Sequence, residues 1–119
     1  MTRIPEKDRD ILEKAMYLPM LLTILERDRM VFEKGGFKLK EPYLQLLEET
    51  IKVVQRDLKD TKSVMRNGQM RVEQVAKDED FTMFLFVYKG FEERHNYFNP
   101  RIRNKVQELL GHYLFRRFL

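Results

Sequence analysis

The chain of 119 residues contains no cysteine, only two histidines and no long uninterrupted apolar run. The absence of cysteine excludes disulfides, thiolate zinc sites, iron–sulfur clusters and a cysteine nucleophile, and it fits a reducing compartment. The longest mostly apolar run, 15–25, is about half a membrane span and contains Pro19. The charged N-terminus lacks the apolar centre of a signal peptide. These features predict a cytoplasmic protein without a membrane segment.

The sequence also lacks a recognisable catalytic, metal-binding or phosphate-binding pattern. The glycines Gly35-Gly36 are not followed by the Lys-Ser/Thr pair of a P-loop. The run 78–80 is acidic but has neither the spaced oxygen ligands nor the glycine of a calcium loop. We therefore predict a protein that is not an enzyme and holds no metal or cofactor. That view would change if His95 or His112 lay in a pocket against a buried carboxylate.

What the chain does contain is enough apolar material for one core. Hydrophobic residues make up 43% of the sequence and include nine phenylalanines and five tyrosines, which excludes a disordered chain. The length is too short for two ordinary domains, so we predict a single domain over residues 1–119. The net charge of +4 is concentrated in residues 99–119, which carry five basic side chains and one acidic side chain. A basic segment of this kind is typical of a solubilising surface or of a polyanion-binding one.

Two long helices are expected first. Pro5 with acidic residues behind it begins one helix, whose middle turns are apolar nearly all round and which Gly35-Gly36 ends. Pro19 lies inside this helix and predicts a kink or a break near Leu18. Glu41-Pro42 begins a second helix that should run to about Arg66. Its apolar residues recur at heptad spacing: Leu44, Leu47, Ile51, Val54, Leu58 and Met65.

The spacing of apolar residues along the sequence changes in the segment 70–98. Alternation at 70–72, a turn at 77–80 and an aromatic run at 81–88 predict two or three antiparallel strands, with Lys89-Gly90 closing a hairpin. Helical spacing over 81–98 is the alternative, and it would give an all-α four-helix bundle. Asn99-Pro100 then begins a C-terminal helix, with Asn99 as the capping residue. The predicted fold class is α+β: two long antiparallel helices, a small antiparallel sheet and a C-terminal helix.

Surplus apolar surface is the main indication of function. The helix over 5–35 and the run 81–88 present apolar side chains on more faces than a small monomer readily covers. We therefore expect the protein to act by self-association, as a homodimer, or by contact with a protein partner. The candidate interface residues are Leu18, Leu22, Leu25, Phe84, Phe86, Phe115 and Phe118.

Nucleic-acid binding by a regulatory protein is the alternative function. Aromatic residues beside basic ones at the start of the C-terminal helix suit base stacking and phosphate binding. The candidate polyanion-binding residues are Arg101, Arg103, Lys105, Arg116 and Arg117. The helix–helix–hairpin–helix order differs from that of a winged-helix protein, which uses similar parts.

Several phrases resemble a family of small uncharacterised proteins from Bacillus-type Gram-positive bacteria. These phrases are Met1-Thr2-Arg3-Ile4-Pro5 through Leu18-Pro19-Met20-Leu21, Gly36-Phe37-Lys38-Leu39 with Pro42-Tyr43-Leu44, and Tyr97-Phe98-Asn99-Pro100 with Ile102-Arg103-Asn104. The resemblance covers most of the chain and implies a bacterial, cytoplasmic origin. It brings no catalytic or binding residue with it.

Overall fold

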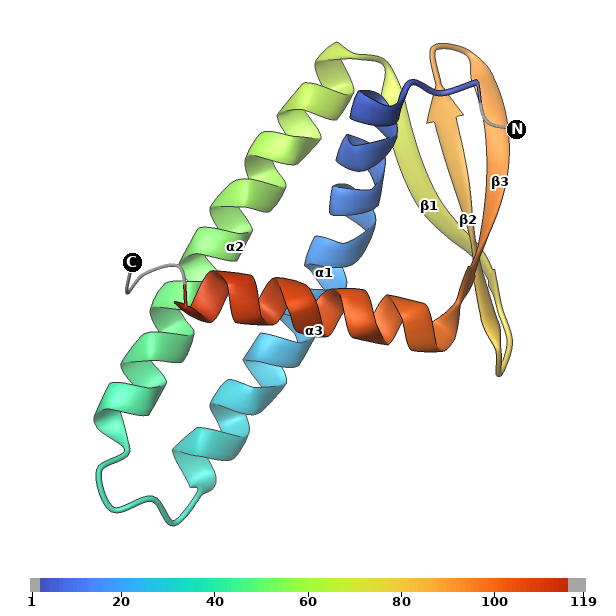
Figure 1. The fold of residues 1–119 in the computed structure, drawn as a ribbon. Helices are drawn as coiled ribbons and strands as arrows, with labels where there is room; N and C mark the ends of the chain where they lie inside the picture. Colours follow the sequence, from blue (N-terminus) through green and yellow to red (C-terminus); the bar gives the residue numbers. More distant parts are fainter. Residues whose placement is uncertain (1–2, 116–119) are drawn as a thin grey trace.

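The computed structural model describes residues 3–115 and combines three helices with a three-stranded sheet (Figure 1). The elements in chain order are α1 (Glu6–Lys34), α2 (Glu41–Asn67), β1 (Met70–Lys77), β2 (Phe81–Tyr88), β3 (Phe91–Phe98) and α3 (Asn99–Phe115). The predicted α+β architecture is therefore confirmed. The alternative of a four-helix bundle is wrong, because residues 81–98 form a hairpin of two strands.

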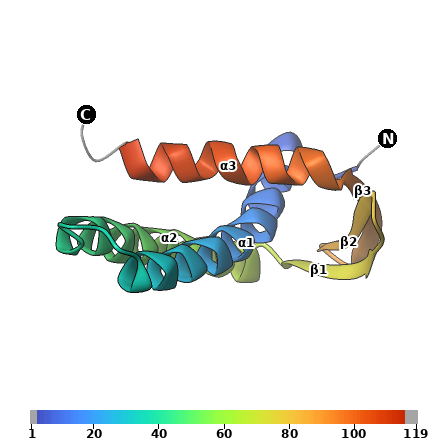
Figure 2. The same ribbon diagram turned by 90° about the horizontal axis from the view of Figure 1, so that it is seen from below.

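The long helices begin and end where local sequence signals place them. Pro5 precedes α1, and Glu6 and Asp8 lie in its first turn, where carboxylates favour the positive end of the helix dipole. α1 continues through Pro19 as one helix, and Figure 2 shows its axis changing direction along its length, so the proline bends the helix without breaking it. α2 ends at Gly68, whose N–H donates to the carbonyls of Val64 and Met65 at 2.9 and 3.2 Å.

The sheet is a simple antiparallel meander with β2 in the centre. Lys89 and Gly90 both have positive φ, 47° and 91°, as a tight two-residue hairpin turn of matching twist requires. Between Gln74 and Ala76 the pairing of β1 with β2 shifts register, which marks a bulge at Val75. The predicted hairpin at Lys89-Gly90 is confirmed.

Alternation along β2 gives the sheet two different faces. Thr82, Phe84, Phe86 and Tyr88 are buried and form the inner face, which α1 and α3 cover. Figure 2 looks along the strands and shows these helices on the concave side of the curled sheet. The other face, called the outer face below, carries Phe81, Met83, Leu85 and Val87 in its central strand.

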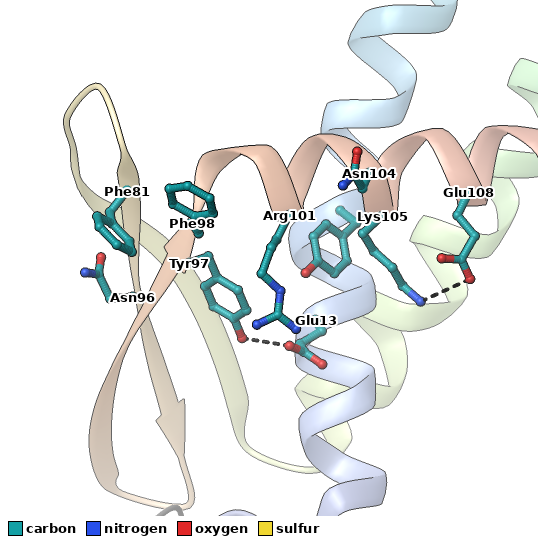
Figure 3. Close-up of a pocket in the computed structure, with 10 residues that line it drawn as sticks. Glu13, Phe81, Asn96, Tyr97, Phe98, Arg101, Asn104, Lys105 and Glu108 are labelled. Atoms are coloured by element: carbon teal, nitrogen blue, oxygen red, sulfur yellow. Dashed lines mark hydrogen bonds and ion pairs between the residues drawn. The ribbon is translucent and has the colours of Figure 1, made fainter.

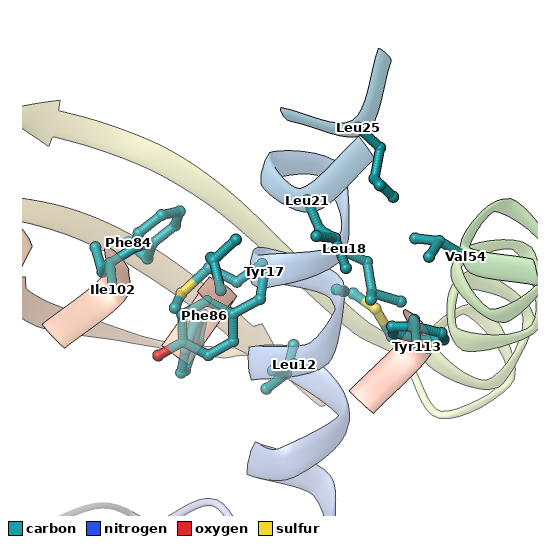
Figure 4. Close-up of a cluster of buried hydrophobic side chains, with 14 of the residues drawn as sticks. Leu12, Tyr17, Leu18, Leu21, Leu25, Val54, Phe84, Phe86, Ile102 and Tyr113 are labelled. Carbon is teal, nitrogen blue, oxygen red and sulfur yellow. The ribbon is translucent and has the colours of Figure 1, made fainter. Parts of the chain in front are cut away.

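The core forms around the middle of α1 (Figure 4). Leu12, Leu18, Leu21 and Leu25 are fully buried there, because α2, α3 and β1 all contact this helix. Most of the apolar surface in the first half of α1 is thus covered within one chain, whereas Ile24, Met30 and Val31 further along stay exposed. The other side chains at the centre of the cluster come from α2, the inner face and α3: Val54, Phe84, Phe86, Ile102 and Tyr113.

Asn99 joins the end of β3 to the β1–β2 turn. Its backbone N–H donates to the Asp80 carbonyl at 2.7 Å, and its side-chain amide donates to the carbonyls of Asp78 and Glu79 at 3.0 and 3.1 Å. Its Oδ1 accepts a 2.6 Å hydrogen bond from the Thr82 hydroxyl. We predicted Asn99 as the cap of the C-terminal helix. Its side chain instead ties the first residue of that helix to the sheet.

Candidate functional site

α3 crosses from the sheet toward α2 over α1 (Figure 1). A cavity lies on each side of this helix. The first, called the polar cavity, has a volume of about 520 Å³ and lies between α1, β3 and α3 (Figure 3). The second, called the apolar cavity, has a volume of about 460 Å³ and lies between α1, the β1 end of the sheet and the opposite side of α3. Both volumes are in the range of ligand-binding pockets in proteins.

A tyrosine–carboxylate pair forms the inner wall of the polar cavity. The Tyr97 hydroxyl donates to Glu13 on α1 at 2.8 Å. Burial raises the pKa of Tyr97 well above the usual range, and the adjoining Glu13 carboxylate adds to this effect. Burial likewise raises the pKa of Tyr17, on which Arg101 acts in the opposite sense. Figure 3 shows Arg101 pointing from α3 toward Glu13.

The charges around the polar cavity cancel. Arg101 and Lys105 come from α3, whereas Glu13 and Glu108 supply two carboxylates. Lys105 lies 3.8 Å from Glu108 and forms an exposed ion pair with it. This balance makes the polar cavity an unsuitable site for a polyanion.

The predicted polyanion-binding residues do not share one surface. Arg101 and Lys105 line the polar cavity, while Arg103 lines the apolar cavity on the other side of the same helix. Arg116 and Arg117 lie outside the described residues. Nucleic-acid binding stays a prediction, without a continuous basic face on the described part of α3.

Along β3, polar side chains alternate between the two faces of the sheet. Glu93 and His95 lie on the inner face, where His95 Nε2 is 2.9 Å from Glu93 Oε1 and its ring stacks on Phe86 at 4.6 Å. Glu92 and Arg94 lie on the outer face. The period of two along β3 was the signal that would have separated them.

The conditions for a histidine-based active site are only half met. His95 contacts a half-buried carboxylate, but it lines neither the polar cavity nor the apolar cavity. Residues 3–115 contain no cluster of three side chains able to hold a metal ion. The prediction that the protein is not an enzyme stays a prediction.

The outer face of the sheet is covered by no helix of the described chain. Its apolar stripe runs along β2, and Phe81 at one end is 39% exposed. Leu85 in the middle of the stripe is 6% exposed and lies apart from the main core. Val75 and Phe98 add exposed apolar surface beside the stripe.

Charged side chains of opposite sign frame this stripe. Val87 lies between Arg71 on β1 and Glu92 on β3 in the pairing register. One step along, Leu85 lies between Glu73 on β1 and Arg94 on β3. All four charged residues are exposed: Arg71, Glu73, Glu92 and Arg94. The arrangement is a basic–acidic pair on β1 facing an acidic–basic pair on β3.

Most of the predicted interface residues have to be corrected. Four of them are buried in the core of a single chain and are not available to a partner: Leu18, Leu25, Phe84 and Phe86. Leu22 is half-buried, Phe115 is 69% exposed, and Phe118 lies outside the described residues. Within the apolar run at 81–88, the two residues predicted for the interface, Phe84 and Phe86, are those that point into the core.

A second exposed apolar group was missed at the α1–α2 connection. The rings of Phe32, Phe37 and Tyr43 contact one another with centroids 4.8 to 5.6 Å apart. Leu39 beside them is 73% exposed. These contacts close the end of the helical hairpin.

No helix within residues 3–115 is long and apolar enough to cross a membrane.

Comparison with known proteins identifies a family rather than an activity. A protein-family model described as "YhjD protein" matches residues 3–118. The uncharacterized protein YhjD of Bacillus subtilis (strain 168) is 44% identical over 115 residues, which cover 97% of this chain and 96% of that protein. No solved structure matches. The resemblance noted in the sequence is thereby confirmed, and the chain belongs to the YhjD family.

Proposed function

We propose that the protein acts by self-association, as a homodimer in which the outer faces of two sheets pack together. The observation that carries this proposal is the charge pattern around the apolar stripe. At the level of Val87 the β1 side is basic and the β3 side acidic, and at the level of Leu85 the signs are reversed. A face of this kind is complementary to a copy of itself.

The symmetry follows from the register. A two-fold axis parallel to the strands keeps every residue at its own level and lays β1 of one copy over β3 of the other. Arg71 then faces Glu92 of the second copy, and Glu73 faces Arg94. The same operation places the stripe of β2 on its own counterpart, as in two aligned sheets packed about 10 Å apart.

Energetically the stripe and the charges have different roles. Covering half-exposed side chains such as Phe81, Met83 and Val87 contributes about 1 kcal/mol each, since part of their surface is already buried. Solvent-exposed ion pairs contribute only about 0.2–1 kcal/mol each. The apolar stripe would therefore supply most of the affinity, and the ion pairs would set the register and orientation.

The test is a charge-swap series followed by sedimentation velocity or light scattering. The wild-type protein should be a dimer at tens of micromolar, and Arg71→Glu should weaken it at least tenfold, because two carboxylates would then face each other at both symmetric positions of the interface. The double variant Arg71→Glu/Glu92→Arg should restore the dimer, since the swap recreates both ion pairs. Lys52→Glu, on the exposed side of α2, changes the net charge equally and should leave the dimer intact.

A wild-type monomer at these concentrations would overturn the proposal. A dimer that persists in both Arg71→Glu and Met83→Lys would show that another surface makes the contact. Failure of the double variant to recover, with folding intact by circular dichroism, would reject the two-fold arrangement.

A further inference from the structure

The apolar cavity differs from the polar cavity in both lining and charge. Five aliphatic or thioether side chains form its walls, namely Met20 and Ile24 from α1 and Ile102, Val106 and Leu110 from α3. Ile24 is 40% exposed, and Met20 and Leu110 are half-buried, so these walls are accessible from solvent. Val106, 4% exposed, joins them to the core.

Two cations line this cavity and no carboxylate does. Lys77 approaches from the end of β1 and Arg103 from the first turns of α3. Within residues 3–115 neither forms an ion pair, whereas Lys105 in the polar cavity is paired with Glu108. The nearest acidic turn residue along the chain from Lys77 is Asp78, and its carboxylate accepts hydrogen bonds from the backbone of Asp80 and Phe81.

Four uncharged polar side chains also line the cavity. Thr82 and Asn99 are already bonded, because Thr82 donates to Asn99 and Asn99 donates to the β1–β2 turn. Gln74 and Gln107 are exposed and carry no charge, so Lys77 and Arg103 are the charged groups in the lining that can bind an anion.

We propose that this cavity binds an aliphatic carboxylate of medium chain length. The hydrocarbon chain would lie along Met20, Ile24 and Leu110, and its carboxylate would be held between Lys77 and Arg103. Positive charge without a facing acid selects an anionic head group. The apolar walls select an aliphatic tail rather than a sugar or a nucleotide. The site lies on the inner side of the sheet and is independent of the proposed dimer face.

Calorimetric titration with a homologous series of ligands tests the proposal. Hexanoate, octanoate and decanoate should bind one per chain, with affinity rising about fourfold for each added methylene until the cavity is filled. Decanol and decyltrimethylammonium should bind at least tenfold more weakly than decanoate. These differences separate recognition of the head group from general hydrophobic binding.

Two double variants locate the site. Lys77→Gln/Arg103→Gln should weaken decanoate at least tenfold and leave decanol unchanged. Arg101→Gln/Lys105→Gln removes the same two residue types from the polar cavity and should bind decanoate like the wild type. Both pairs are exposed, so folding should survive, as circular dichroism would verify.

Several results would overturn the proposal. Among these are no heat of binding for decanoate up to about 1 mM, equal affinity for decanol, and equal loss in the two double variants. Co-sedimentation with vesicles of phosphatidylglycerol and phosphatidylcholine, without binding of free decanoate, would indicate a lipid-surface contact instead and would also reject the site.

Discussion

Replacing Tyr97 by Phe is the sharpest test of how α1 is attached to the sheet. The substitution removes one hydroxyl and leaves the ring, which contacts Phe84 with centroids 5.8 Å apart. What is lost is the 2.8 Å hydrogen bond to Glu13, which links β3 to α1 across 84 positions of sequence. Hydrogen bonds to charged groups are worth about 1.5–3 kcal/mol. Glu13 lines the polar cavity and can be rehydrated, so we expect a loss near the lower end, about 1.5 kcal/mol.

The same substitution has a signature at alkaline pH. The pKa of Tyr97 is raised in the folded protein, first by burial and then by the Glu13 carboxylate. The protonated Tyr97 hydroxyl contributes fully to the free energy of unfolding below the ordinary tyrosine pKa of about 10. As the pH rises above that value the unfolded chain loses the phenolic proton and the folded chain keeps it, so the contribution falls. The stability gap between wild type and Tyr97→Phe should therefore narrow above about pH 10.

Urea unfolding followed by circular dichroism, at neutral pH and above pH 10, measures both effects. Tyr43→Phe is the matched control, because Tyr43 is 49% exposed at the far end of the helical hairpin and should change neither quantity. A loss below about 0.5 kcal/mol at neutral pH, together with an alkaline slope identical to that of the wild type, would refute the reasoning.

Three further substitutions test the sheet and its turns. Phe86→Ala removes a fully buried ring and should lower the free energy of unfolding, measured by urea titration, by about 3–5 kcal/mol. A loss under about 1 kcal/mol would contradict the packing of this ring in the core. Gly90→Ala places a side chain at a φ of 91° and should cost about 1–2 kcal/mol although the surrounding space is open, so an unchanged unfolding midpoint would argue against this turn. Hydrogen bonds from the backbone of Phe81 and Asp80 lower the pKa of Asp78, so its stabilising effect is present above its ordinary pKa of 3.8 and is lost as the pH falls through the lower folded value. In the Asp78→Asn variant, the thermal unfolding midpoint should therefore fall less steeply with decreasing pH in the acid range. An acid pH dependence equal to that of the wild type would reject the stabilising role of the Asp78 carboxylate.

Local signals explain why most of the fold was predictable. The heptad pattern of α2 and its stop at Gly68 depend on residues within a few turns of each other. The Lys89-Gly90 turn also depends on neighbours alone, because positive φ at two adjacent positions selects glycine-containing pairs. The competing helical spacing over 81–98 lost because inter-strand pairing, a non-local interaction, decides between the two.

The candidate surfaces were less accessible to sequence reasoning. Phe86 and Leu85 are adjacent, both apolar and both buried, yet Phe86 belongs to the main core and Leu85 lies on the outer face, apart from it. Which of the two points into the core depends on the face of the sheet on which the helices pack, and that is a non-local arrangement. The separation of Arg101 from Arg103, and the two cavities beside them, likewise depends on the direction in which α3 crosses α1.

The direct passage from β3 into α3 has a mechanical consequence. β3 ends at Phe98 and α3 begins at Asn99, so no flexible linker separates the sheet from the helix. With a rise of about 1.5 Å per residue, the 17 residues of α3 form a lever roughly 25 Å long. A change of about 10° in the twist of the sheet at Asn99 would move the far end of that lever by about 4 Å. The far end of the lever is held by the 2.7 Å hydrogen bond from Tyr113 to Asp57 of α2, so a twist of the sheet would act directly on that contact.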